Sequence, residues 1–468
     1  MIKKYLYTLL FIAAGFFAGC EDRTELTEPA AQNPNRGQVD LTKFVSIGNS
    51  ITAGYQSGSL FQSAQEFSFP SQIAKQVGTT FVQPLVGDPG TLGRIEIVSL
   101  SPFATQYNST SGTPLNIGYS LPYNNLGIPG ALLVDILKAT SSGTSASGNN
   151  PMFDLILRGS GTVFQQARLL QPTFITLWIG NNDVLGFATS GGVRPTSPTP
   201  ATAFAFLYSQ LADSIASLGA KVVVANIPDV LAIPFFRTVG PQMAMLIPWR
   251  TPGLPGMFYQ KHGESAGTTY IDSIGLLTGT VVVPLTGSSY APLLGQATGK
   301  FYRDNHYPAL PPGIDTTKPF GFHPTNPWPD ALILDADEIV TARTATTSFN
   351  ETISTVAQAK GWGLVDFYSL LNNIAASTFT GGTKYNGVTF TSMLVTGGLF
   401  SLDGVHPSSQ GHAIIANEFI KVLNTKWDAN IPLINVAEVP GSLYFAKQNI
   451  NKYLYPEYRN MNWNNLLF

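Results

Sequence analysis

Four short polar motifs in this chain carry side chains that could together perform acyl transfer. The motifs are GNS, LGIPG, IGNND and DGVHP, and their polar or small residues are Ser50, Gly130, Asn182, Asp403 and His406. Acyl transfer needs a nucleophile, a base, a group that orients the base, and donors for an oxyanion. These residue types therefore predict a serine-dependent hydrolase.

Ser50 is the candidate nucleophile. A serine hydroxyl attacks a carbonyl only when a base takes its proton. Ser50 follows the apolar run KFVSI closely and precedes ITAGY, which can open a helix, so its backbone N–H is expected to face a developing negative charge. The same position also suits a serine that only caps a helix. Both interpretations stay open for Ser50 alone.

Asp403 and His406 are the candidate orienting group and base. Their spacing allows a carboxylate on a tight turn to accept the proton of one ring nitrogen while the other nitrogen faces the serine. Pro407, Ser408 and Ser409 then supply a helix start. A solvated surface ion pair is the alternative interpretation of this motif.

Asn182 and Gly130 are candidate oxyanion donors. The amide of Asn182 can donate a hydrogen bond, and Gly130 offers a backbone N–H that no side chain blocks. Each residue has a simpler alternative, because Asn182 also suits a loop cap and Gly130 a tight turn before a helix.

The four motifs, in this order, resemble the SGNH or GDSL superfamily of esterases and lipases. The resemblance extends to VVVANIPD at 222–229 and covers most of the chain between 43 and 424, outside long insertions. Asn49 stands where Asp is commoner in the name-giving motif, and Ile51 stands where Leu is commoner. These departures bear on the subfamily and not on the reacting groups.

The resemblance implies a role for each candidate residue. Ser50 would be the nucleophile, and Asp403 with His406 would complete the catalytic triad. Gly130 and Asn182 would form the oxyanion hole together with the amide of Ser50. No cofactor and no metal is expected. The resemblance also implies a three-layer α/β/α sandwich around a five-strand parallel sheet of the flavodoxin-like type.

The hydrophobic pattern independently predicts an α/β fold. Continuous apolar runs typical of strands buried on both faces occur at 44–47, 174–179, 222–227 and 364–367. Helical patterns occur at 131–140, 164–170, 201–218, 331–360 and 410–423. This alternation predicts a parallel sheet with helices on both faces and chemistry at the carboxyl ends of the strands.

The sequence predicts one hydrolase domain at 43–430 with long insertions. Three stretches near 56–122, 232–329 and 378–400 are dense in Gly, Pro, Ser, Thr and aromatic residues, and we expect them to build the rim of the site. A C-terminal extension at 431–468, rich in Asn and Tyr, is expected to pack back on the domain.

The N-terminus predicts export. Two lysines precede a short apolar stretch that ends at Cys20, the only cysteine of the chain, which resembles a bacterial lipoprotein signal at 1–19. Residues 20–42 are expected to form a flexible tether. The expected location is the bacterial cell envelope, through a lipid anchor on Cys20 and with the outer membrane favoured. An ordinary secretory signal is the alternative.

Composition excludes some partners. The 468 residues contain 26 Lys plus Arg and 28 Asp plus Glu, and the net charge of -2 gives no field that would attract nucleic acid. The oligomeric state is not predicted. A single cysteine also excludes a disulfide framework within the chain.

A rival motif, GESAG, surrounds Ser265. It matches the G-x-S-x-G nucleophile elbow of α/β-hydrolases, but a Pro-rich stretch precedes it where that motif needs a buried strand. Ser265 is therefore the weaker candidate.

Other titratable residues do not predict a metal site. His262, His306 and His323 lack the helical spacing of zinc ligands, and Asp335 with its acidic neighbours lacks the pattern of a calcium loop. His412 is expected to be packed in the final helix.

The expected reaction is hydrolysis of a carboxylic ester through an acyl-enzyme on Ser50. The substrate would be a small-molecule, lipid or glycan ester, and Trp178 with the aromatic-rich loops would shape its pocket or belong to the core. Two alternatives remain, a carbohydrate O-acetyl esterase that uses the same site and a non-catalytic binding lipoprotein on the cell surface.

Overall fold

The computed structural model describes residues 34–446 apart from 102, 251–252, 255, 265–266 and 268, and the side chains of 249 and 250 are also not described. The predicted signal peptide, Cys20 and Ser265 lie outside the described residues. The described residues from Arg36 to Ala446 belong to one compact unit, to which the description below applies.

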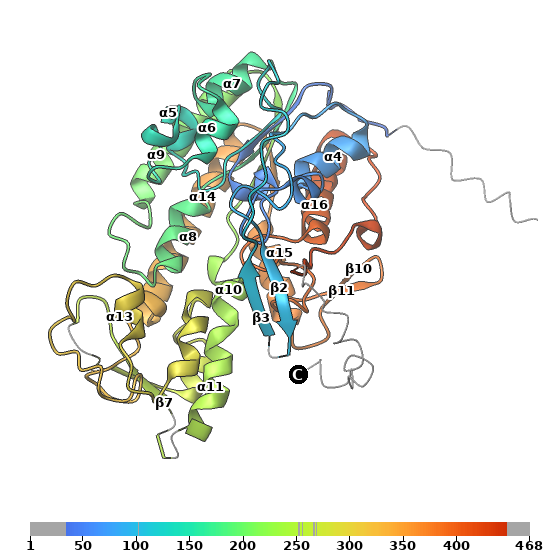
Figure 1. Cartoon of the computed structure of the whole chain (residues 1–468). Coiled ribbons are helices and arrows are strands. Elements are labelled where there is room, and N and C mark those ends of the chain that lie inside the picture. Colours follow the sequence, from blue (N-terminus) through green and yellow to red (C-terminus); the bar gives the residue numbers. More distant parts are fainter. Residues whose placement is uncertain are drawn as a thin grey trace, which may run out of the picture. The chain divides into compact units, whose positions relative to one another are not determined.

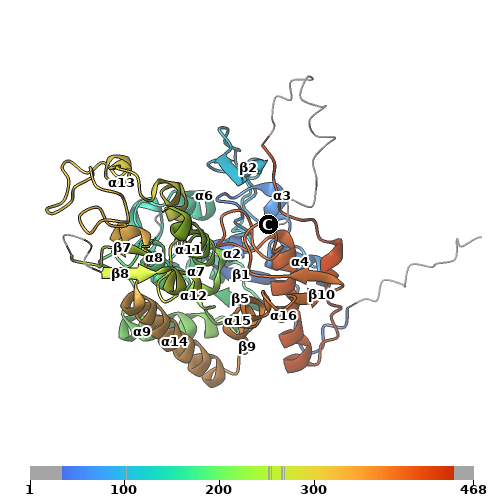
Figure 2. The same cartoon turned by 90° about the horizontal axis from the view of Figure 1, so that it is seen from below.

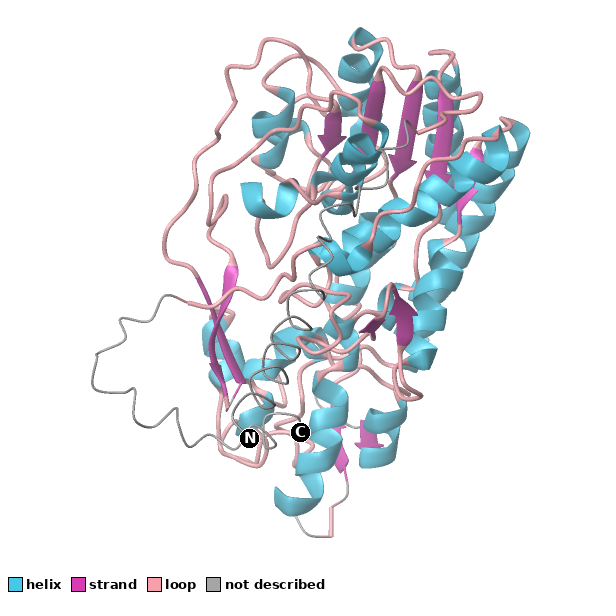
Figure 3. Cartoon of the chain, turned by 90° about the vertical axis from the view of Figure 1, so that its right-hand side faces the viewer, coloured by secondary structure: helices cyan, strands magenta, loops and turns pink. Residues whose placement is uncertain are grey.

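A five-strand parallel sheet forms the centre of this unit, as predicted (Figure 3). The strands are β1 (Phe44–Gly48), β4 (Asn125–Gly127), β5 (Phe174–Trp178), β6 (Lys221–Ala225) and β9 (Gly363–Val365). Their spatial order is β4-β1-β5-β6-β9, which in sheet numbering is the 2-1-3-4-5 order of flavodoxin-like folds. The predicted α/β class and sandwich are therefore confirmed.

Four of the five strands coincide with the apolar runs of the sequence, whereas β4 was not predicted. β4 has only three residues, and its Asn and Gly have low strand propensity. Side-chain bonds hold it in place, because Asn125 Nδ2 donates to Thr52 O at 2.8 Å and Gly127 N donates to Asn125 Oδ1 at 3.0 Å.

The two faces of the sheet carry separate hydrophobic cores because successive strand residues point to opposite sides. In β1, Val45 and Ile47 belong to one core, and Phe44 belongs to the other. The first face is covered by α5 (Asp135–Lys138), α6 (Met152–Leu157), α7 (Val163–Leu169), α8 (Asn182–Thr189), α9 (Ala201–Ala216) and α14 (Ala336–Ala359). The second face is covered by α4 (Phe69–Val77) and α16 (Ser409–Trp427). Figure 2 shows β1 and β5 between these two helical layers.

Capping side chains define where the two longest helices begin. Asp335 caps α14 in a capping box with Glu338, and Ser408 caps α16 by accepting from Gly411 N. The helical pattern predicted at 331–360 therefore begins five residues later in the structure. The residues Asp330–Leu332 form a separate 3-10 turn.

The three Gly- and Pro-rich stretches contain regular structure. Stretch 56–122 holds α3 (Gln62–Gln65), α4 and the hairpin β2 (Ile95–Leu100) with β3 (Phe103–Tyr107), and it therefore supplies one helix of the sandwich itself (Figure 1). Stretch 378–400 holds the hairpin β10 (Thr383–Tyr385) with β11 (Val388–Phe390).

Stretch 232–329 forms a subdomain with its own core. Its elements are α10 (Pro234–Arg237), α11 (Val239–Arg250), β7 (Gly256–Tyr259), β8 (Thr269–Asp272), α12 (Ser273–Thr278) and α13 (Lys300–Asp304). Met243, Tyr259 and Trp328 are among the buried residues of this third core. The stretch is therefore a folded unit and not a long loop.

The chain after α16 returns to the β2–β3 hairpin. Ile97 N donates to Tyr444 O at 2.7 Å, and Ala446 N donates to Ile97 O at 2.9 Å, so this segment lies along β2. Within the described part of the chain, no helix combines the length and apolar character needed to cross a membrane.

Candidate active site

The candidate site lies at the carboxyl ends of three neighbouring strands. Gly48 at the end of β1 pairs in register with Gly127 of β4 on one side and with Trp178 of β5 on the other. The strand order reverses between β1 and β5, and ligands of such sheets bind at that reversal. Ser50, Gly130 and Asn182 follow these three strand ends, and Ser50 and Asn182 are the first residues of helices there.

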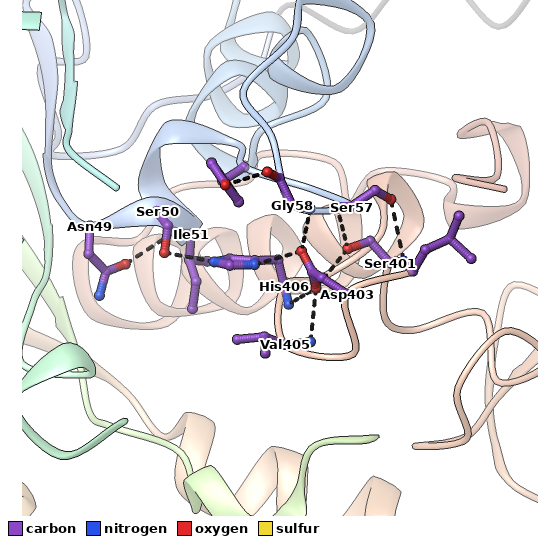
Figure 4. A network of polar contacts seen from close by, with 11 residues as sticks. Asn49, Ser50, Ile51, Ser57, Gly58, Ser401, Asp403, Val405 and His406 are labelled. Carbon is purple, nitrogen blue, oxygen red and sulfur yellow. Dashed lines mark hydrogen bonds and ion pairs between the residues drawn. The ribbon is translucent and has the colours of Figure 1, made fainter. Parts of the chain in front are cut away.

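The structure brings Ser50, His406 and Asp403 into one hydrogen-bonded row (Figure 4). His406 Nε2 lies 2.9 Å from Ser50 Oγ although 356 positions separate the two residues, and His406 Nδ1 lies 2.9 Å from Asp403 Oδ2. A carboxylate can only accept, so Nδ1 carries the proton and Nε2 is left to accept from the serine hydroxyl.

Asp403 is held as an anion by several donors. Its Oδ1 accepts from the backbone N–H groups of Val405 and His406, both at 2.9 Å, and from Ser401 Oγ at 3.2 Å. Its Oδ2 accepts from Gly58 N at 2.9 Å as well as from His406. Burial raises the pKa of Asp403, but the charge and hydrogen bonds of His406 and the backbone donors outweigh burial and lower it to about 2. Asp403 is therefore ionised at neutral pH.

Asn49, and not Ser50, caps the short helix α2 (Ser50–Ala53). Asn49 Oδ1 accepts from Ile51 N at 3.1 Å, and Asn49 Nδ2 donates to Asn181 Oδ1 at 3.1 Å. The alternative in which Ser50 only caps a helix is therefore wrong. Its hydroxyl is free of that role and contacts His406 instead.

The predicted oxyanion donors are Gly130, in the loop after β4, and Asn182, at the start of α8, and the two segments are joined by a hydrogen bond. Gly130 has a φ of +80°, in the left-handed region that favours glycine. Asn182 Nδ2 donates to Ala131 O at 2.9 Å, which places the amide next to Gly130. A primary amide has two N–H bonds, so this contact leaves a second one for a substrate oxygen.

Asp183 holds the loop that carries Gly130 in position through a hydrogen bond to its backbone. Its Oδ2 accepts from Leu133 N at 2.9 Å, and its Oδ1 accepts from Thr199 Oγ1 at 2.8 Å. Burial raises the pKa of this carboxyl to about 6 in spite of these two bonds. The motif IGNND thus supplies a side chain at the site and an anchor for the neighbouring loop.

Sequence reasoning missed the residues that join the serine loop to the His406 loop. Ser57 N donates to Ser401 Oγ at 2.9 Å, and Leu402 N donates to Ser57 Oγ at 3.3 Å. The ring of Tyr55 lies 4.8 Å from that of His406. Ser57 and Ser401 stand 344 positions apart, and no local pattern indicates such a contact.

His412 and His262, which the sequence did not assign to the site, lie outside this network. His412 is fully buried on α16, burial lowers its pKa to about 3, and neither ring nitrogen has a partner within the described residues. His262, in the 232–329 subdomain, pairs at 3.1 Å with Asp330, which begins the 3-10 turn that follows this stretch. Among the residues that the structure describes, no group of three His, Cys, Asp or Glu side chains could hold a metal ion.

Trp178 belongs to the core and also lines a cavity. It is 2% exposed, stacks on Phe367 with ring centroids 4.2 Å apart, and donates from Nε1 to Asn226 O at 3.1 Å. It also lines an apolar cavity together with Ile51, Val405 and Pro407, which are the sequence neighbours of Ser50 and His406. The two roles considered for Trp178 are thus compatible.

Several solved structures are similar to this chain over most of its length. A mutant of Axe2, an acetyl-xylooligosaccharide esterase from Geobacillus, matches at 11% identity and a TM-score of 0.32, covering 82% of this chain and 94% of that one. An extracellular lipase from Streptomyces rimosus matches at 15% identity and a TM-score of 0.28, covering 82% and 98%. A gut microbial diltiazem-metabolizing enzyme matches at 12% identity and a TM-score of 0.31, covering 83% and 49%.

The family assignment rests on the sequence profile of a known family. No curated protein matches the chain. The profile of the GDSL-like Lipase/Acylhydrolase family matches residues 44–272 and 302–419, which include all four motifs. The chain therefore belongs to the GDSL-like lipase/acylhydrolase family and is a carboxylic ester hydrolase of the SGNH type.

Proposed function

We propose that this protein hydrolyses carboxylic esters through a covalent acyl-enzyme on Ser50. His406 Nε2 takes the hydroxyl proton as Ser50 Oγ attacks the ester carbonyl carbon. The tetrahedral oxyanion receives hydrogen bonds from the Ser50 and Gly130 N–H groups and from the Asn182 amide. His406 then gives its proton to the departing alcohol oxygen, and the ester C–O bond breaks.

The second half of the reaction repeats these steps with water. His406 takes a proton from a water molecule, whose oxygen attacks the acyl carbon. The bond to Ser50 Oγ breaks, the serine recovers its proton from His406, and the free acid leaves. Asp403 keeps the imidazole in one orientation and stabilises its positive charge in both halves.

The hydrogen-bonded row from Ser50 through His406 to Asp403 carries this proposal. The decisive experiment compares Ser50→Ala with Ser265→Ala on an activated ester. We expect Ser50→Ala to lower kcat by about three orders of magnitude or more, because the residual rate then comes only from binding and the oxyanion donors. Ser265→Ala should leave kcat within about twofold of the wild type.

A fluorescent phosphonate gives a second measurement that does not require turnover. It should label the wild-type protein and the Ser265→Ala variant but not Ser50→Ala. A protein that binds esters without hydrolysing them would not react, and unlabelled wild type with no turnover would contradict the proposal.

We also propose that the mature protein is anchored in the bacterial cell envelope by lipid on Cys20, with the outer membrane favoured. The support is the lysine, apolar and small-residue pattern that ends at this cysteine. A fatty-acid analogue fed to expressing cells should label the wild type and not Cys20→Ser. Equal labelling of both would contradict lipidation at this residue.

A further inference from the structure

An apolar cavity of about 70 Å³ is lined by Ile51, which follows Ser50 in the chain, and by Val405 and Pro407, which flank His406. The helices α15 (Phe367–Ser377) and α16 contribute Leu371, Ile374 and Ile414 to its walls. Resting on the proposed function, we infer that this cavity binds the acyl chain of the ester and that it selects short chains longer than acetyl.

The position of the cavity fits the acyl group. Ile51 follows Ser50 directly, and Val405 and Pro407 flank His406. In Figure 4 the side chains of Ile51 and Val405 extend to the same side of the Ser50–His406 row, opposite Ser57 and Gly58. A carbonyl carbon bonded to Ser50 Oγ would therefore have the cavity on one side.

The chemistry of the walls fits a hydrocarbon. Every lining residue is aliphatic, aromatic, proline or glycine, and the indole N–H of Trp178 is already bonded to Asn226 O. A sugar hydroxyl placed here would lose its bonds to water without replacement. A methylene group would gain from leaving water. The walls therefore favour an acyl chain over a sugar.

The cavity lies where the two main cores meet. Ile233, Leu371 and Ile374 belong to the core on one face of the sheet, and Trp178 and Ile415 belong to the core on the other. Protein interiors are normally filled to the density of organic crystals. Space left between two well-packed cores, next to a nucleophile, suits a substrate group.

The volume limits the length of the chain. A cavity needs roughly 10–15 Å³ of such space to hold one water-sized group, so about 70 Å³ has room for about five such groups and an acyl chain of about three to six carbons. An acetyl group would leave most of the space empty, and a long fatty acyl chain would not fit.

A series of p-nitrophenyl esters tests this inference. We expect kcat/KM for butyrate or hexanoate to exceed that for acetate by about tenfold or more, since a methylene group in a fitted pocket contributes at least about this factor. Dodecanoate should react more slowly than hexanoate. Acetate as the best substrate of the series, or an acetylated sugar that reacts faster than butyrate, would overturn the inference.

Substitutions of Leu371, which is 9% exposed, test the cavity itself. Leu371→Trp should lower kcat/KM for hexanoate about tenfold or more while acetate stays within about threefold. Leu371→Ala enlarges the cavity and should shift the preferred ester to longer chains. This second variant decides the question if the tryptophan variant does not fold.

The matched control is Leu169→Trp, because Leu169 is 65% exposed on α7. It should leave the chain-length profile unchanged. An equal loss for all esters in both Leu371 variants, with the wild-type profile retained, would assign Leu371 a structural role only and contradict the inference.

Failure of the inference differs from failure of the proposed function. If Ser50 is labelled by the phosphonate and needed for turnover while acetate is the best ester, the hydrolase stands and the cavity does not bind the acyl chain. If no ester reacts and Ser50 is not labelled, the proposed function itself fails.

Discussion

Two His–Asp pairs in this molecule have similar geometry and different surroundings. His406 Nδ1 lies 2.9 Å from Asp403 Oδ2, and the two side chains are 14% and 11% exposed. His262 Nδ1 lies 3.1 Å from Asp330 Oδ2, with side chains 62% and 16% exposed. The first pair continues to a serine hydroxyl, whereas the second joins the 232–329 subdomain to the 3-10 turn Asp330–Leu332.

The carboxylates differ most clearly in their donors. Asp403 receives hydrogen bonds at both oxygens, and its pKa falls to about 2 despite burial. Asp330 Oδ1 is buried without a hydrogen-bond partner among the described residues, and burial raises the pKa of this carboxyl to about 6. A distance between His and Asp therefore does not define a catalytic pair. At Asp403 the charge of His406 and the donors to both oxygens outweigh burial, whereas at Asp330 burial outweighs the contribution of His262 to the pKa.

The largest expected difference between the pairs concerns the histidines. His406→Ala removes the base, and we expect kcat to fall about 10⁴-fold or more. His262→Ala should change kcat less than about twofold. Steady-state kinetics with p-nitrophenyl butyrate measure both values. If His262→Ala caused the larger loss, the assignment of the site would be wrong.

Substitution of Asp403 should likewise lower kcat far more than substitution of Asp330. Asp403→Asn presents an NH₂ group to His406 Nδ1 and Gly58 N, which favours the wrong imidazole tautomer, and kcat should fall about 10³- to 10⁴-fold. Asp330→Asn should keep kcat within about twofold. Thermal unfolding of both variants provides the control, because a loss of folding in Asp403→Asn would also abolish activity. A folded Asp403→Asn variant with near wild-type kcat would contradict the role of this charge.

The acidic groups near the His262–Asp330 pair should also affect how protein stability depends on pH. Burial raises the pKa of Glu338, which shares a cluster with Asp330, from 4.5 to about 7. Between these two pKa values the folded state binds more protons than the unfolded state. The contribution of Glu338 to the free energy of unfolding is therefore fully present below pH 4.5 and is lost as the pH rises through about 7.

Glu338→Gln keeps the capping acceptor for Asp335 N and removes this titration. Urea unfolding should show the variant more stable by about 1–3 kcal/mol at pH 8 and little changed at pH 4. Glu351→Gln, on the exposed face of the same helix, is the matched control and should show no such difference. A stability gain that is equal at both pH values would contradict the linkage.

The smallest effect concerns a single donor to Asp403. Ser401→Ala removes the 3.2 Å bond to Asp403 Oδ1 and the acceptor of Ser57 N, and kcat should fall about three- to tenfold. Ser217→Ala, which removes an exposed serine at the end of α9, should leave kcat unchanged. A loss as large as that of Asp403→Asn would mean that Ser401 holds the whole loop and not one bond.

The positions of the site residues relative to the strands were predictable from sequence, and their contacts were not. Ser50 and Asn182 each follow an apolar run that the structure confirms as a strand. The capping role of Asn49 was missed, because Ser50 is an equally good capping type and only the bond to His406 distinguishes the two. Gly58 carries no local signal for its bond to Asp403, which spans 345 positions.

The fold shows the same division. Strands buried on both faces are apolar enough to stand out, and four of them were predicted. β4 and α4 were missed because β4 is short and polar, and α4 begins with Phe69-Pro70 inside a Gly- and Pro-rich stretch. The subdomain of 232–329 was taken for loops because its helices are short and are interrupted by prolines such as Pro248.

The sequence by itself determined the α/β class, the order of the motifs and the residue types able to perform acyl transfer, because hydrophobic period and turn chemistry are local properties of the chain. Only the tertiary structure decided which carboxyl has a lowered pKa and which a raised one, which side chain caps the serine helix and where an apolar cavity opens. Those features depend on donors and walls contributed by segments hundreds of residues apart. Burial and hydrogen bonding at such distances are set by packing, which no local pattern encodes.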